Sequence, residues 1–230
     1  MKLLAVRHGQ ASFHAEDYDR LSDLGGQQAR ALGQWLLRHD YQFDRVVSGQ
    51  LRRHEETLRA IGDVFAAAGR PLPTVEVDPA FDEFDHRRVI AGFVQCFPQH
   101  PSVAAAEFGR SRDHLRLFDL LRAALRAWSQ QQLDQHAEPW SAFKQRTRHA
   151  GHALAERARK QHVLLISSGG VISQLVAMAM EAPDHRAVDL NLSLRNAALS
   201  ELQWLDDGPM LASWNGIPHL ADQRSMWTYV

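Results

Sequence analysis

Three residues near the start of the chain, Arg7, His8 and Gly9, combine groups that suit phosphoryl transfer. Arginine carries a permanent charge and donors arranged for phosphate oxygens, and an imidazole nitrogen can act as a nucleophile. Glycine lets the backbone approach a ligand closely. The tripeptide follows a short apolar run, residues 2–6, which is typical of a buried strand. We therefore expect His8 at the carboxyl end of a strand, the edge at which α/β sheets bind ligands.

A second segment with chemical potential, residues 48–57, follows another short apolar run at residues 45–47. It reads Ser-Gly-Gln-Leu-Arg-Arg-His-Glu-Glu-Thr and leads into a predicted helix. Arg53 and Thr57 are four residues apart, so they share one face of that helix. Arg52 and the two glutamates fit a solvated, charged face equally well.

A third segment, Phe-Asp-Glu-Phe at residues 81–84, offers Glu83 as a proton donor. A glutamate acts well as an acid when its pKa is raised toward neutrality, and the two flanking aromatic rings can supply the desolvation that does so. Asp85 and His86 are adjacent alternatives for the same role or for orienting a substrate.

The fourth segment, Ser-Ser-Gly-Gly at residues 167–170, follows an apolar run at residues 163–166 and precedes a helical pattern. Ser168 provides a hydrogen-bond donor. The glycines open a helix, where unpaired N–H groups point toward an anion. The chain thus places a polar turn between a strand and a helix once more.

In this order the four segments resemble those of the histidine phosphatase superfamily, which has the phosphoglycerate-mutase-like fold. Its members show Arg-His-Gly after the first strand, then a Ser, Leu, Arg and Thr pattern, a glutamate, and Ser-His-Gly-Gly. The resemblance spans residues 1 to about 202. It implies a nucleophile at His8, an acid at Glu83, and phosphate-binding groups at Arg7, Arg53, Ser168 and Gly169.

Two assignments depend on how the sequence is aligned with the family pattern. Alignment on Leu51 and Thr57 makes Arg53 the phosphate-binding arginine, whereas members with one residue fewer after the serine favour Arg52. Ser168 stands where the family usually has its second histidine, and the chain is similar here to a bacterial subfamily that carries serine. A serine keeps a donor but gives up the potential charge, and the loss of one such donor typically slows chemistry about a hundredfold or more.

The implied reaction is hydrolysis of a phosphoric monoester through a phosphohistidine, without cofactor or metal, because arginines hold the phosphoryl charge. Phosphoglycerate-mutase-like transfer is one alternative. A phosphate-binding or regulatory protein that has lost turnover is another, favoured by Ser168. Gln10, Ser12 and Asn196 are assigned to the rim of the site by position. His149 and His152 lie one helical turn apart without a recognisable third metal ligand.

The predicted elements fit a three-layer α/β/α sandwich with a mainly parallel central sheet. A helix begins after Ser22, and a long one follows Pro139. Strands at residues 197–204 and 210–214 are joined by an Asp-Asp-Gly-Pro turn. We expect one domain, residues 1–230, with a mainly helical cap inserted at about residues 80–137.

Composition limits the classes of partner that we expect the chain to bind. The 230 residues are 45 % hydrophobic and 23 % charged with a net charge of −1, which argues against nucleic acid. The uncharged stretch 163–180 is interrupted by serines, glycines and a glutamine, so no membrane span is expected. A single cysteine suits the cytoplasm. The expected partner is a phosphorylated small molecule, and Trp227 and Tyr229 pack either on the chain's own core or in a homodimer.

Overall fold

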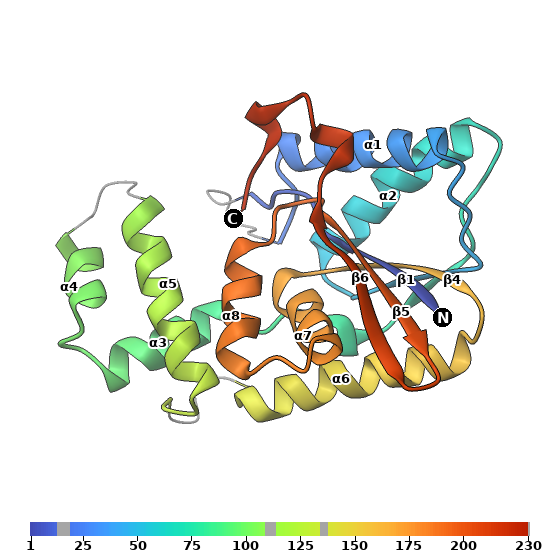
Figure 1. The fold of residues 1–230 in the computed structure, drawn as a ribbon. Helices are drawn as coiled ribbons and strands as arrows, with labels where there is room; N and C mark the ends of the chain where they lie inside the picture. The colour runs from blue at the N-terminus through green and yellow to red at the C-terminus, as the bar shows by residue number, and fades with distance from the viewer. Residues whose placement is uncertain (13–18, 109–113, 134–137, 230) are drawn as a thin grey trace.

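The structure is a computed structural model that describes residues 1–12, 19–108, 114–133 and 138–229 (Figure 1). Its centre is a six-stranded sheet with the strand order β3-β2-β4-β1-β5-β6. The first four strands in this order are mutually parallel, and β5 and β6 are antiparallel additions at one edge. The strands are β1 (Lys2–Arg7), β2 (Arg45–Ser48), β3 (Val75–Val77), β4 (His162–Ser167), β5 (Leu199–Leu205) and β6 (Gly208–Gly216).

The two central strands carry the predicted catalytic segments to the same edge of the sheet. β1 and β4 pair in parallel, with Arg7 opposite Ser167. The residues that follow them, His8 and Ser168, therefore leave the sheet side by side. Both residues are buried, because helices cover the sheet on both faces.

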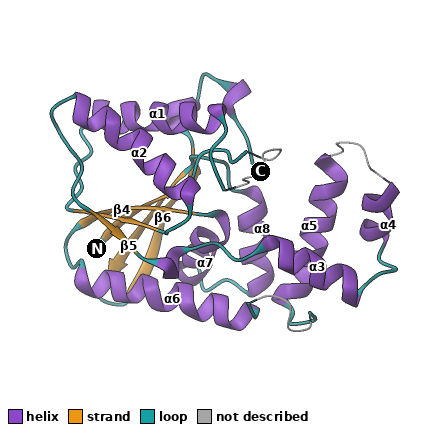
Figure 2. Cartoon of the chain, turned by 180° about the vertical axis from the view of Figure 1, so that it is seen from behind, coloured by secondary structure: helices purple, strands orange, loops and turns teal. Residues whose placement is uncertain are grey.

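Helices cover both faces of the sheet, as Figure 2 shows in purple around the orange strands. On one face lie α1 and α2, and on the other lie α6 and α7, with α8 packed against α7. The helices of these layers are α1 (Asp23–Arg38), α2 (Arg52–Ala67), α6 (Trp140–Arg157), α7 (Gly169–Ala179) and α8 (Asp184–Ser193).

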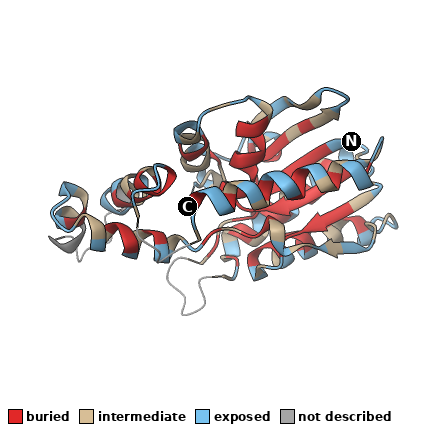
Figure 3. Cartoon of the chain, turned by 90° about the horizontal axis from the view of Figure 1, so that it is seen from below, coloured by how far each residue is buried: buried red, intermediate tan, exposed pale blue. Residues whose placement is uncertain are grey.

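Alternation along the strands explains this layering. In β1, Leu4 and Val6 join the core beneath α1 and α2, whereas Leu3 and Ala5 join the core on the opposite face. Successive side chains of a strand point to opposite faces, so a continuous apolar run serves a sheet covered on both sides. Figure 3 shows the buried strands enclosed by helices with exposed outer faces. The predicted three-layer α/β fold is therefore confirmed.

Three further helices stand beside the sheet rather than on it, packed on α8 through α5 (Figure 1). They are α3 (His86–Cys96), α4 (Pro101–Phe108) and α5 (His114–Ser129). The sequence pattern predicts only the last of them clearly. An aromatic cluster joins them to the core, with the ring of Trp128 4.6 Å from that of Phe84 and 4.9 Å from that of Trp140, measured between centroids. That this stretch is a cap inserted into one domain stays a prediction.

Candidate active site

The predicted nucleophile and two predicted phosphate ligands lie within hydrogen-bonding distance of one another. Arg53 reaches from α2 to the edge of the sheet, where its Nε donates to Nε2 of His8 over 3.2 Å. Its Nη2 donates to Oγ of Ser168 over 3.4 Å. Segments more than a hundred residues apart in the chain thus meet around one guanidinium group.

The ring of His8 is held in one orientation. Its Nδ1 lies 2.7 Å from the carbonyl oxygen of Gly9, so Nδ1 carries the hydrogen and Nε2 presents its lone pair. The Gly9 amide donates to Oγ1 of Thr57, which donates to the carbonyl of Arg53. These bonds fasten the loop after β1 to the first turns of α2.

Burial keeps His8 neutral. It lowers the pKa of the imidazole well below its ordinary value, and the charges of Arg53 and Arg7 act in the same direction. A neutral imidazole whose Nε2 carries a lone pair is the nucleophilic form.

The structure separates the two adjacent arginines that sequence alone leaves as alternatives. Arg53 is buried and faces His8, and its Nη1 forms a 2.6 Å ion pair with Asp19. Arg52 is exposed and pairs with Glu56 over 2.7 Å along the outer face of α2. One residue along a helix turns a side chain by about 100°, so only one of the two can point inward.

Glu83 lies at the amino end of α7, on the segment that follows the short 3₁₀ turn at Pro79–Phe81. The Gly170 amide donates to its Oε2 over 2.9 Å. A side chain at position 170 would collide with this carboxyl group and with the ring of Phe84. Burial raises the pKa of Glu83, and the opposing effects of Gly170 and the two arginines are smaller. Its surroundings therefore favour the protonated form, which can donate.

Arg7 occupies the space between β1 and α7. One of its Nη nitrogens donates to the carbonyl of Leu194, and its guanidinium carbon lies 3.6 Å from where a Cβ on Gly169 would be. The Gly170 amide is already bonded to Glu83, so Gly169 is the residue of the α7 terminus that we consider beside Arg7. The cation and the helix terminus face the same small region.

Two histidines that the sequence reasoning gave no firm role also lie here. His54 is fully buried, and its Nε2 lies 2.7 Å from Oγ of Ser168. His86, the first residue of α3, has its pKa lowered by burial and then by the charge of Arg53, which places it within electrostatic reach of the site. One signal could have revealed His54: it shares a helix face with Leu58 and Ile61, both buried.

The three residues assigned to the rim serve local bonds. Oε1 of Gln10 accepts from Oγ of Ser22, the residue that caps α1, and Oγ of Ser12 donates to the carbonyl of Leu21. Asn196 is buried behind the nucleophile, with its Nδ2 3.5 Å from the carbonyl of His8. Its Oδ1 accepts from Oγ1 of Thr228, so the end of the described chain supports the loop that bears His8.

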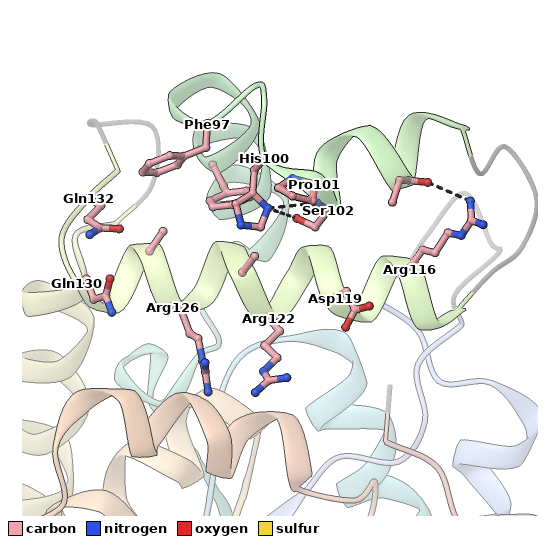
Figure 4. A pocket seen from close by; sticks show the side chains of 14 residues that line it. Phe97, His100, Pro101, Ser102, Arg116, Asp119, Arg122, Arg126, Gln130 and Gln132 are labelled. Carbon is pink, nitrogen blue, oxygen red and sulfur yellow. Dashed lines mark hydrogen bonds between the residues drawn. The ribbon is translucent and has the colours of Figure 1, made fainter.

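A cavity of about 680 Å³ lies elsewhere, between α3, α4 and α5 (Figure 4). Phe97 and His100 border it on one side, and Arg122 and Arg126 leave α5 on the other side toward the core. None of the predicted site residues lines this cavity. The site at the edge of the sheet is defined by its chemistry and contacts rather than by hollow volume.

Within the described residues, no group of three histidine, cysteine, aspartate or glutamate side chains is placed to hold a metal ion. No helix of that part of the chain is long and apolar enough to cross a membrane. The uncharged stretch 163–180 forms β4 and α7.

Comparison with known proteins now places the chain. The profile of the histidine phosphatase superfamily (branch 1) matches residues 3–92 and 106–217. The chain belongs to this superfamily, which confirms the resemblance drawn from its four motifs.

Solved structures share the fold at low identity. Phosphoglycerate mutase from Bacillus anthracis is 20 % identical with a TM-score of 0.67, covering 96 % of this chain and 95 % of that one. The alpha-ribazole phosphatase from Shigella flexneri is 22 % identical with a TM-score of 0.62, covering 94 % and 97 %. Phosphoserine phosphatase from Entamoeba histolytica, solved with 3-phosphoglyceric acid, is 17 % identical with a TM-score of 0.62, covering 95 % and 98 %.

Proposed function

We propose that the chain is a phosphatase that hydrolyses phosphoric monoesters of small molecules through a phosphohistidine on His8. The observation that carries this proposal is the state of that ring: buried, neutral, bonded through Nδ1, and in contact with Arg53 through Nε2. Superfamily membership and relatives named as phosphatases support the same class.

In the first step, Nε2 of His8 attacks phosphorus and the bond to the ester oxygen breaks. Glu83 gives its proton to the departing alcohol, which leaves neutral. Arg7 and Arg53, with the amide of Gly169, hold the equatorial oxygens of the transferring group. Because two guanidinium groups supply the positive charge, we propose that no metal takes part.

In the second step, water attacks the phosphohistidine. The carboxylate of Glu83 takes the proton of this water, the bond between nitrogen and phosphorus breaks, and inorganic phosphate leaves. His8 returns to its neutral state and Glu83 to its acid form.

The substrate is proposed by class only: a phosphorylated small molecule, in keeping with the phosphorylated ligand named for the Entamoeba relative. A cytoplasmic location, drawn from the single cysteine, belongs to the same proposal.

The test is steady-state hydrolysis of a panel of phosphate monoesters, with chelator present, by the wild type and His8→Ala. The matched control is His149→Ala, which removes an exposed histidine on α6. We expect turnover in the wild type and control and none in His8→Ala. Rapid quenching should trap a phosphoryl group that is labile to acid and stable to base.

A second candidate, a phosphate-binding protein without turnover, is favoured by Ser168, which stands where the family usually has its second histidine. It predicts that inorganic phosphate binds to the wild type while no monoester is hydrolysed and no covalent intermediate forms. A mutase would instead return the phosphoryl group to the organic product, which product analysis of the same reactions detects.

A further inference from the structure

Ser168 does not stand alone at the amino end of α7. Its Oγ lies 2.7 Å from Nε2 of His54, and both side chains are fully buried. The ring centre of His54 lies 5.7 Å from that of His8. A second imidazole is therefore present beside the nucleophile, but it comes from α2 and reaches the site through a serine hydroxyl.

The chain makes room for this ring. A Cβ on Gly49 would lie 2.5 Å from Nδ1 of His54 and 2.6 Å from Oδ1 of Asp82, so any side chain at position 49 would displace the imidazole or the carboxylate. Nδ1 of His54 has no hydrogen-bond partner, which is uncommon for a buried polar atom. The groups nearest to this nitrogen, the Asp82 carboxylate at 3.9 Å and the backbone of Gly49, therefore leave it without a well-formed hydrogen bond.

The groups that face His54 come from every neighbouring element. Asp82 lies 3.9 Å from Nδ1, and the carbonyl of Gly49 favours a proton on the ring. Burial opposes it, as does the charge of Arg53, so the pKa of His54 is lowered. A bound phosphoryl group brings negative charge beside Ser168 and shifts this balance toward a proton on Nε2.

Building on the proposed function, we propose that His54 is a positioning residue that acts with Ser168 in place of a single histidine. When a phosphoryl group is bound, Nε2–H of His54 donates to Oγ of Ser168. The serine hydroxyl then donates its own hydrogen to a phosphoryl oxygen. The relay breaks no bond to phosphorus: His54 takes up one proton from solvent as the ligand binds, and two hydrogen bonds then change their orientation.

Arg53 favours the same orientation of the Ser168 hydroxyl group. Its Nη2 also donates to Oγ of Ser168, so this oxygen receives two donors and its own hydrogen is left to point toward the ligand. Donors fixed before the reaction stabilise the charge of a transition state without reorganisation. The pair thus supplies what a lone buried serine would lack.

The experiment uses a double-mutant cycle on kcat/KM with His54→Leu, Ser168→Ala and the combined variant. Leucine keeps an apolar side chain of similar reach without a donor. We expect each single variant to lose on the order of tenfold to a hundredfold and the combined variant to lose no more than either. His54→Gln, whose amide can donate, should recover part of the loss.

A swap sharpens the test. His54→Ala with Ser168→His vacates the space of the first ring and places an imidazole at position 168. We expect this double variant to recover much of the activity that His54→Ala loses. Unfolding temperatures of all variants identify any that fail to fold, and His149→Ala again serves as the control.

The proposal would be overturned if the loss in the combined variant equalled the product of the two single losses. Full activity in His54→Leu would also overturn it. So would a stable phosphoryl adduct on Ser168, because the hydroxyl would then donate to His54 and act as the nucleophile. If the wild type hydrolyses nothing, the proposed function fails but the relay is still tested by binding of orthovanadate. Equal, non-additive weakening of that binding in the same three variants supports the relay, and unchanged binding overturns it.

Discussion

The edge of the sheet and the three-helix region beside it differ in what they contain: one holds bonded polar side chains and the other holds a cavity. At the edge, each polar side chain is fixed by named bonds: His8 by Gly9, Arg53 by Asp19, and Glu83 by Gly170. The region of α3, α4 and α5 holds a cavity of about 680 Å³, yet its lining shares no residue with that set. The candidate site residues are therefore held by contacts at the sheet edge, whereas the three-helix region surrounds a cavity that none of them lines.

After His8→Ala, the largest effect should come from substitution of Glu83, the proposed acid. We expect Glu83→Gln to lower kcat about 10²- to 10⁴-fold for alkyl phosphates. The loss should be much smaller for p-nitrophenyl phosphate, whose alcohol leaves without a proton. Steady-state kinetics on the two substrates measures this difference, and equal losses on both would contradict the role of Glu83.

The same acid sets a pH dependence. Burial raises the pKa of Glu83, so the acid form persists toward neutrality and is lost as pH rises through that raised value. The kcat for alkyl phosphates should therefore fall on the alkaline side, and this limb should be absent in Glu83→Gln. A profile of kcat against pH for both proteins tests the assignment.

Substitution of two adjacent arginines tests whether only the buried one contributes to the candidate site. Arg53→Ala should lower kcat/KM about 10²- to 10³-fold, because it removes the donor group shared by His8 and Ser168. Arg52→Ala removes an exposed ion pair with Glu56 and should change kcat/KM less than about twofold. Similar losses in both variants would show that the exposed arginine also contributes to the site.

Stability should respond to acid through a buried histidine outside both regions. Neither ring nitrogen of His219 has a hydrogen-bond partner, and burial lowers its pKa to about 4. The unfolded chain takes up this proton below about pH 6.5 and the folded chain does not, so stability is lost as pH falls. Between pH 7 and pH 5 the loss is about 2 kcal/mol. Denaturant unfolding of His219→Leu should show that much less dependence on pH than the wild type, and His149→Leu should not.

The smallest effect is expected in the three-helix region. Ala123 borders the cavity on α5. Ala123→Leu should leave kcat/KM for p-nitrophenyl phosphate within about twofold and the free energy of unfolding within about 0.5 kcal/mol. A large loss of turnover on this small substrate would show that the cavity communicates with the edge of the sheet.

The features that could be predicted from the sequence are those that depend on local patterns of residues. Short apolar runs before His8 and Ser168 indicate strands, and β1 and β4 end one residue before them, at Arg7 and Ser167. The choice between Arg52 and Arg53 depends on how α2 rotates against the sheet, which packing decides. His54 was missed for the same reason.

The helix α3 was missed because its pattern is mixed. Val89 and Phe93 are buried four residues apart, but three polar residues precede them at 86–88, Gly92 lies between them, and two prolines follow at 98 and 101. A helix that packs on other helices outside the main core needs only a narrow apolar stripe, so its signal in the sequence is weak.

The guanidinium group of Arg53 is engaged through Nε, Nη1 and Nη2 with His8, Asp19 and Ser168. An arriving phosphate ester must therefore exchange partners with groups already in place, and the same groups reclaim the arginine when inorganic phosphate departs. We expect this competition to make the enzyme tolerant of its own product, so that turnover continues in a phosphate-rich medium.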